Sequence, residues 1–245
     1  EEVLSQAQVM YNVISSTATK GFKSKVYGQR HISFEIVARG GLVYYYTVVP
    51  IVLVDIVKQA VAAAYPSARL EEVEEHSIFS EAGKISGTIG GEFTLKKNLV
   101  YPIATYVDTK QDASRALLNA LSAAKKDDGV GIQILLRPAR DNWSKEAHKK
   151  VQSIKEDRAS GKHGGGGYSG AKSIMSALWK APSSDDEKPS EKETLGKQLT
   201  AMEQKEIEAI EEKTRYPGYE VLIRVVVSSN TAGRSQTLLQ NIVSA

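Results

Sequence analysis

Two distant segments of the chain alternate apolar and polar residues with a period of two. Residues 130–136 carry aliphatic side chains at every even position, and residues 219–227 carry aromatic or aliphatic side chains at every odd position. A period of two places every second side chain on the same face of an extended chain. Each segment therefore predicts a β-strand with one buried face.

A hairpin is predicted near the N-terminus. Residues 31–38 alternate, and residues 42–49 are rich in β-branched and aromatic side chains, which favour strands. Gly40 and Gly41 lie between them and tolerate the positive φ angles of a two-residue turn. Pro50 ends the second strand because proline cannot donate a hydrogen bond to the ladder.

Apolar residues that recur every three to four positions predict amphipathic helices. The helix near residues 51–65 ends at Tyr65, since a residue before proline avoids the helical region. A final helix follows a capping residue, either Asn230 or Thr231. The other helices expected from this periodicity span residues 2–17, 113–124, 142–157 and 195–213.

Less regular segments connect these elements. Residues 68–78 contain a run of glutamates and predict an exposed strand, and residues 92–97 predict another. Residues 83–91, between them, predict a loop. Residues 100–107 are expected to be extended. The helix that follows them is expected to be capped by Asp108 or by Asp112.

These elements predict an α+β protein built from two ferredoxin-like units. Such a unit is a split βαβ arrangement in which helices cover one face of a small sheet. Residues 1–82 supply the first unit, and residues 83–158 the first half of the second. Residues 195–245 supply a helix and the truncated second half. Residues 159–194 are rich in glycine and charge, which predicts a flexible insertion.

Composition narrows the possible functions. The chain has 32 basic and 29 acidic residues, and this net charge of +3 is too small to indicate nucleic-acid binding alone. The absence of cysteine excludes thiol nucleophiles, disulfides and thiolate metal sites. No run of 18 apolar residues predicts a transmembrane segment. The chain begins at Glu1 without methionine and ends at Ala245 inside an apparent helix, so we expect a fragment of a longer protein.

No set of residues has the pattern of an active site, so we expect no enzyme activity, cofactor or metal ion. Residues 166–173 resemble a P-loop with Ala171 in place of glycine, but they follow a glycine linker rather than a buried strand. The four histidines do not pair at the spacing of metal ligands. Arg137 and Asn142 would be the anion site if the chain were a small hydrolase.

A lysine-rich helical segment is the main candidate for contact with a partner or with phosphates. Lys145, Lys149 and Lys150 belong to the helix expected over residues 142–157, where acidic residues dilute their charge. Trp179 lies beside a segment that is predicted to be disordered. Its large apolar side chain could anchor a protein partner.

A series of motifs in a specific order resembles one known family. The Ile32–Val49 hairpin, the Tyr65–Pro66 helix end and Tyr101–Pro102 fit the family pattern. Together with the later motifs, they resemble the region before the motor domain in type IV secretion-like, conjugation-type ATPases of small-genome bacteria. The later motifs are Trp143–Ile154, residues 161–170, Leu178–Pro182, Leu199–Lys213 and Pro217–Arg224.

The resemblance implies a position in a larger machine. It implies a transmembrane segment before Glu1 and a HerA/FtsK-like motor after Ala245, at the cytoplasmic face of the inner membrane. The chain itself would be a non-catalytic assembly or docking domain. Its partners would be other subunits of the secretion assembly, with a homo-oligomer formed through the parent motor. The alternative is a module that contacts nucleic acid and feeds DNA to the motor.

Overall fold

The chain folds into two compact units with an α+β architecture. The computed structural model describes residues 2–19, 28–74, 77–79, 87–104, 113–140, 142–159 and 199–245. These residues form six α-helices and a five-stranded antiparallel sheet, which confirms the expected α+β class. The first unit comprises Glu1–Asn98, Ile103–Arg140 and Pro217–Ala245, and the second comprises Leu99–Pro102 and Asp141–Tyr216.

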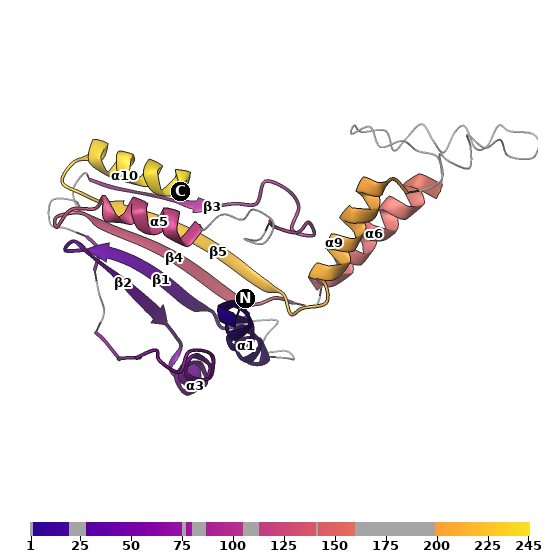
Figure 1. Ribbon diagram of the computed structural model, residues 1–245, viewed down its shortest axis with the longest axis horizontal. Helices are drawn as coiled ribbons and strands as arrows, with labels where there is room; N and C mark the ends of the chain where they lie inside the picture. The colour runs from indigo at the N-terminus through magenta and orange to yellow at the C-terminus, as the bar shows by residue number, and fades with distance from the viewer. Residues whose placement is uncertain are drawn as a thin grey trace, which may run out of the picture. The chain divides into compact units, whose positions relative to one another are not determined.

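The first unit is built around the sheet, whose strand order is β2-β1-β4-β5-β3 (Figure 1). Every neighbouring pair is antiparallel. Residues 1–82 and 83–158, expected as separate units, therefore contribute strands to one shared sheet. The strands are β1 (Ile32–Arg39), β2 (Leu42–Val48), β3 (Thr88–Phe93), β4 (Gly129–Pro138) and β5 (Tyr219–Ser228).

Four helices of the first unit pack against the same face of this sheet. Their apolar stripes confirm the predicted periodicity, and the last helix begins after Thr231, whose hydroxyl accepts a hydrogen bond from the Arg234 backbone N–H at 3.3 Å. A short 3-10 helix, η1 (Ile51–Leu53), leads into the second of them. The helices are α1 (Glu2–Ser16), α3 (Val54–Ala64), α5 (Ala113–Ser122) and α10 (Ala232–Ser244).

The buried core lies between these helices and the sheet. Ile32 and Leu136 pack with α1 and α3 in one cluster. Val130, Ile132 and Val227 pack with α5 and α10 in a second cluster. The strand register places all five side chains on one face. Residues that lie opposite each other in the ladder point their side chains to the same side, and so does every second residue along a strand. We call this the covered face.

The second unit is a pair of helices, α6 (Asn142–Ala159) and α9 (Ala201–Lys213). The short segment Leu99–Pro102, which precedes both helices in the chain, belongs to the same unit. The Lys213 ammonium donates hydrogen bonds to the carbonyls of Leu99 at 2.6 Å and Tyr101 at 2.9 Å. Burial there lowers the pKa of Lys213. The buried side chains of the unit are Val100, Ala147, Val151, Ile207 and Ile210.

A polar network caps the start of α9. The Thr200 hydroxyl and the Glu203 side chain form a reciprocal capping box. Arg158 of α6 donates to both carboxylate oxygens of Glu203 at 2.8 Å. Hydrogen bonds from Arg158 and Thr200 lower the pKa of Glu203 to about 2. This network ties the two helices together at one end.

Two strand predictions were wrong, one in existence and one in position. Residues 68–74 and 77–79 form no strand, because none of the described strands pairs with them. The strand expected over 92–97 spans Thr88–Phe93 instead, so the glycines at 90 and 91 lie inside it rather than in a loop. The expected capping residues Asp108 and Asp112 lie outside the described residues, as does nearly all of the 159–194 insertion.

Candidate functional site

The face of the sheet opposite the covered face is the candidate functional site. It is formed by the odd-numbered residues of β1 and β4 and the even-numbered residues of β2, β3 and β5, as the register requires. In the described part of the first unit, no helix contributes to a buried cluster on this side. We call it the open face.

A row of polar side chains crosses the open face at right angles to the strands. Each member lies directly opposite the next in the strand register. The Gln133 amide donates to Glu35 at 2.7 Å, and Arg224 donates to Glu92 at 2.9 Å. We call this set the polar row. From β2 to β3 it consists of Tyr46, Glu35, Gln133, Arg224 and Glu92.

An aromatic corner closes the polar row at its β2 end. The rings of Tyr44 and Tyr46 stack with centroids 6.0 Å apart. The Arg39 guanidinium lies 5.3 Å from the centroid of the Tyr44 ring and donates a hydrogen bond to the Tyr46 hydroxyl at 3.1 Å. The arginine therefore holds the two rings in place and is itself satisfied.

An apolar trough runs beside the polar row, toward the β1–β2 turn. It consists of four residues, one from each of four neighbouring strands, that lie opposite one another in the register: Val37, Gly131, Val226 and Gly90. A Cβ atom at Gly131 would approach the Ile78 side chain to 3.1 Å, so the missing side chain makes room for Ile78. A hollow of about 650 Å³ remains between this trough and the polar row.

A second apolar row lies on the other side of the polar row. Leu135 and Leu222 line a hollow of about 310 Å³ together with His31. At its margin, Arg137 forms an ion pair with Glu220 at 2.6 Å. The open face thus carries polar groups between two apolar strips, and in the first strip Val37 is only 1% exposed.

The polar groups of the open face are paired with each other. Ser33 donates to Glu35 at 2.9 Å, so this carboxylate accepts hydrogen bonds from two side chains. Among the described residues, no group of three or more His, Cys, Asp or Glu side chains could hold a metal ion. Charged groups that are already paired are poorly suited to proton transfer, but they give a surface a defined pattern of donors and acceptors.

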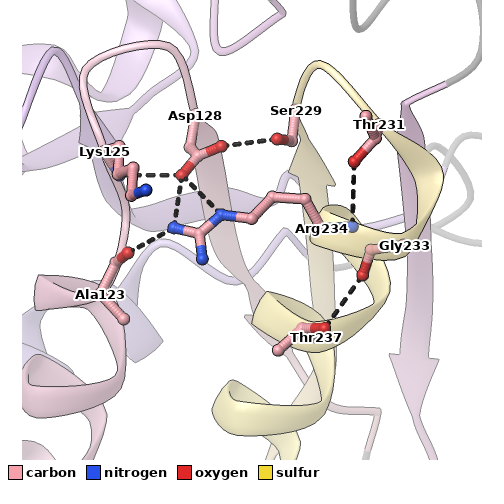
Figure 2. Close-up of polar contacts among 8 residues, drawn as sticks. All are labelled: Ala123, Lys125, Asp128, Ser229, Thr231, Gly233, Arg234 and Thr237. Atoms are coloured by element: carbon pink, nitrogen blue, oxygen red, sulfur yellow. Dashed lines mark hydrogen bonds and ion pairs between the residues drawn. The ribbon is translucent and has the colours of Figure 1, made fainter.

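A separate polar network fastens the ends of β4 and β5 (Figure 2). The Asp128 carboxylate is 5% exposed. It accepts hydrogen bonds from Ser229 at 2.6 Å, the Lys125 backbone N–H at 2.8 Å and Arg234 at 2.9 Å. Arg234 also donates to the Ala123 carbonyl at 2.7 Å. The network joins the α5–β4 turn to the β5–α10 turn, so its role is structural.

Two opposing effects act on Asp128. Its burial raises the pKa of the carboxyl group, because the charged form loses water. The hydrogen bonds from Ser229, Lys125 and Arg234 outweigh this burial and leave the pKa below its ordinary value. Asp128 is therefore a charged, satisfied group rather than a proton donor.

The residues predicted from sequence lie elsewhere. Lys145 and Lys149 are exposed on α6, whereas Lys150 is half-buried with its ammonium 5.9 Å from the centroid of the Tyr101 ring. Trp179 lies outside the described residues, as does the P-loop-like run at 166–173. These lysines therefore belong to the second unit, whereas the open face belongs to the first.

Sequence reasoning missed the polar row. The alternation in β1 and β4 does indicate that Glu35 and Gln133 point away from the core. It cannot show that β1 and β4 are neighbours, since that pairing joins segments almost 100 residues apart.

The comparison with known families concerns nearly the whole chain. A family model matches residues 1–243. The chain belongs to the family described as Domain of unknown function (DUF8128). No curated protein and no solved structure matches the chain. The DUF8128 match includes both compact units, so the sheet and the helix pair are parts of one family domain. Among its described helices, none has the length and apolar character needed to cross a bilayer.

Proposed function

We propose that this DUF8128 domain is a non-catalytic docking domain that binds protein subunits of a larger assembly through its open face. The observation that carries the proposal is the polar row between two apolar strips. Protein interfaces combine apolar contact area with polar groups that fix the register of the partner. A partner side chain can insert into the hollow of about 650 Å³ beside the polar row.

The charge of the open face favours a protein partner over nucleic acid. Its acidic residues are Glu35, Glu92 and Glu220, and its basic residues in the strands are Arg39, Arg137 and Arg224. Nucleic-acid surfaces are strongly basic because affinity comes mainly from phosphate neutralisation. A balanced face of this kind instead gives specificity between proteins.

The family resemblance extends this proposal to a particular machine. The chain resembles the region before the motor of conjugation-type ATPases, so we place it between a membrane segment and a motor. In that position it would bind other subunits of a type IV secretion assembly at the cytoplasmic face of the membrane. The gene on either side of this segment tests the placement. A downstream Walker motif and an upstream hydrophobic span support it, and an unrelated catalytic domain without either contradicts it.

Photo-crosslinking tests the docking surface. The photoreactive amino acid p-benzoylphenylalanine replaces Gln133 or Leu222 on the open face, and Val243, exposed on α10, serves as the control position. We expect adducts with a protein subunit of the assembly from the two open-face positions and none from the control. Adducts with nucleic acid, or ATP hydrolysis by the purified chain, would contradict the proposal.

A second candidate function is contact with nucleic acid through α6. Lys145 and Lys149 are exposed one helical turn apart, whereas Lys155 pairs with Glu211 of α9 at 3.4 Å. Fluorescence anisotropy with single-stranded and duplex DNA at low salt tests it. If α6 binds DNA, the double variant Lys145→Ala/Lys149→Ala lowers the salt slope by about 0.7–0.9 per lost phosphate contact, and Lys126→Ala does not. Absence of binding at low salt would exclude this function.

We also propose that the two ferredoxin-like units correspond to two related halves of the shared sheet. The order helix–strand–strand–helix occurs as α1-β1-β2-α3 and again as α5-β4-β5-α10, where α6 and α9 are inserted between β4 and β5. The two helices of each half pack in one buried cluster, and each cluster also includes a strand residue of the other half, Leu136 in the first and Ala38 in the second. An experimental structure in which the two halves superpose would support the proposal, and different helix directions over the two strand pairs would contradict it.

A further inference from the structure

β2 is an edge strand of the described sheet. In the described part of the sheet it pairs with β1 alone. The two-residue turn at Gly40 and Gly41, with φ of +60° and +81°, makes Arg39 and Leu42 the first hydrogen-bonded pair of the hairpin. Alternate residues of β2 therefore turn their backbone groups toward β1. The intervening residues, Val43, Tyr45 and Thr47, turn theirs away from the sheet.

This edge lacks the features that normally block strand addition. Natural edge strands carry lysine, proline, a bulge or very few residues. β2 has seven residues without charge or proline, and its register with β1 is unbroken. The edge at β3, by contrast, has two glycines and Glu92. Three side chains of β2 are more than half exposed: Leu42 at 61%, Tyr45 at 68% and Val48 at 54%.

The sequence of β2, Leu-Val-Tyr-Tyr-Tyr-Thr-Val, is nearly symmetric about Tyr45. An antiparallel pairing of this strand with a copy of itself would place Tyr45 opposite Tyr45. The flanking pairs would be aromatic with aromatic, β-branched with β-branched and aliphatic with aliphatic, the combinations that stabilise neighbouring strands. These pairs are Tyr44 with Tyr46, Val43 with Thr47, and Leu42 with Val48.

We propose that two copies of the chain join through β2, antiparallel about a two-fold axis at Tyr45, so that their sheets become one continuous sheet. This register places Val43, Tyr45 and Thr47 opposite Thr47, Tyr45 and Val43 of the second copy, so all three outward residues are hydrogen-bonded. A shift of two residues would leave one outward residue of each strand without a partner in the other. A two-fold interface of this kind is self-complementary.

The chain that follows α3 leaves this pairing possible. It passes β2 in Figure 1 without forming a ladder with it. Residues 66–74 are all exposed. Lys58 and Glu72 tie this segment to α3 by an ion pair at 2.5 Å, but both side chains are exposed to solvent. Exposed pairs contribute little to stability, so this ion pair adds little to the cost of moving residues 66–74 aside.

The β2 edge is a different surface from the open face, so this inference does not depend on the docking function proposed above. Because Tyr45 would meet its own copy, one substitution changes both sides of the interface. Tyr45→Lys places two ammonium groups opposite each other, and Tyr45→Glu places two carboxylates opposite each other. Like charges that face each other across strands oppose pairing, whereas a lysine that faces a glutamate favours it.

Sedimentation equilibrium of the full chain over a concentration series tests the proposal. We expect the wild-type chain to form a dimer, and each of the two variants to weaken dimerisation by about tenfold or more. An equimolar mixture of Tyr45→Lys and Tyr45→Glu should restore dimers that contain one copy of each. Val243→Lys, a control at an exposed residue away from the edge, should dimerise as the wild type does.

Three outcomes would overturn the proposal. The first is a wild-type chain that does not form a dimer, even if its β2 strand binds an extended peptide of another protein. The second is a dimer that neither variant weakens. The third is a mixture of the two variants that stays monomeric, which would remove the register centred on Tyr45. Circular dichroism of each variant separates loss of pairing from loss of folding.

Discussion

The covered and open faces are made by the same five strands, yet their side chains meet different surroundings. On the covered face, Val130 and Ile132 pack against helices and are almost fully buried. On the open face, Gln133 and Glu35 bind each other across neighbouring strands. Burial of apolar area is the main source of stability, whereas the net contribution of one partly buried hydrogen bond is smaller. The covered face therefore carries most of the apolar burial, and recognition through the alternate residues of the same strands is the function that we propose.

The largest expected effect on stability comes from shortening a buried side chain on the covered face. Leu238 of α10 is buried in the second cluster. Leu238→Ala removes apolar contacts and leaves a cavity, so we expect the free energy of unfolding to fall by about 2–5 kcal/mol. Urea unfolding followed by circular dichroism measures it. Leu222→Ala on the open face is the control, and an equal loss in that variant would contradict the division between the faces.

The network at the ends of β4 and β5 gives the next largest effect. Asp128→Asn weakens the contact with Arg234 and leaves one acceptor fewer for Ser229, so we expect a loss of about 1–3 kcal/mol at neutral pH. The folded pKa of Asp128 lies below its ordinary value of 3.8. Its stabilisation is therefore complete above that value and is lost as the pH falls through the lower folded pKa.

Unfolding measured against pH checks this prediction. The difference in stability between the wild type and Asp128→Asn should shrink as the solution is acidified below pH 3.8. The variant Thr237→Ala, at an exposed hydroxyl of α10, is a control. Its difference in stability from the wild type should stay constant with pH. A difference for Asp128→Asn that does not change with pH would show that the carboxylate charge has no part in the network.

A glycine of the open face gives an effect of similar size. A Cβ atom at Gly129 would lie 1.8 Å from the Ile78 carbonyl oxygen, so Gly129→Ala must push this segment away. We expect a loss of about 1–3 kcal/mol. Gly91→Ala is the matched control, because nothing lies within 4 Å of a Cβ atom at Gly91. Thermal unfolding compares the two, and equal melting temperatures would mean that the Ile78 contact is not maintained.

The smallest effect on stability is expected within the polar row itself. Arg224 and Glu92 form an ion pair whose side chains are about half exposed. Glu92→Gln should change the free energy of unfolding by less than about 1 kcal/mol. The same variant should reduce crosslinking from position 133 if the row is a docking site. A large loss of stability with unchanged crosslinking would show that the polar row supports the fold and does not dock a partner.

The sequence was informative wherever a single segment carries its own signal. The alternation in residues 219–227 and the paired glycines at 40 and 41 are local features, and both elements form as predicted. Residues 68–74 carry no apolar face that a neighbouring strand could bury, and there the strand prediction failed. Gly90 suggested a loop, but a Cβ atom there would lie 2.7 Å from the Val225 carbonyl oxygen. Close strand approach, not turn chemistry, accounts for this glycine.

By itself, the sequence determined the α+β class, the amphipathic helices and which side of each clear strand is apolar. These properties depend on residues within a few positions of each other. Only the tertiary structure decided the strand order, and with it the polar row that joins Glu35, Gln133, Arg224 and Glu92. Strand pairing depends on contacts between segments far apart in the chain, and several pairings can satisfy the same local alternation. The site is therefore a property of the sheet rather than of any one of its strands.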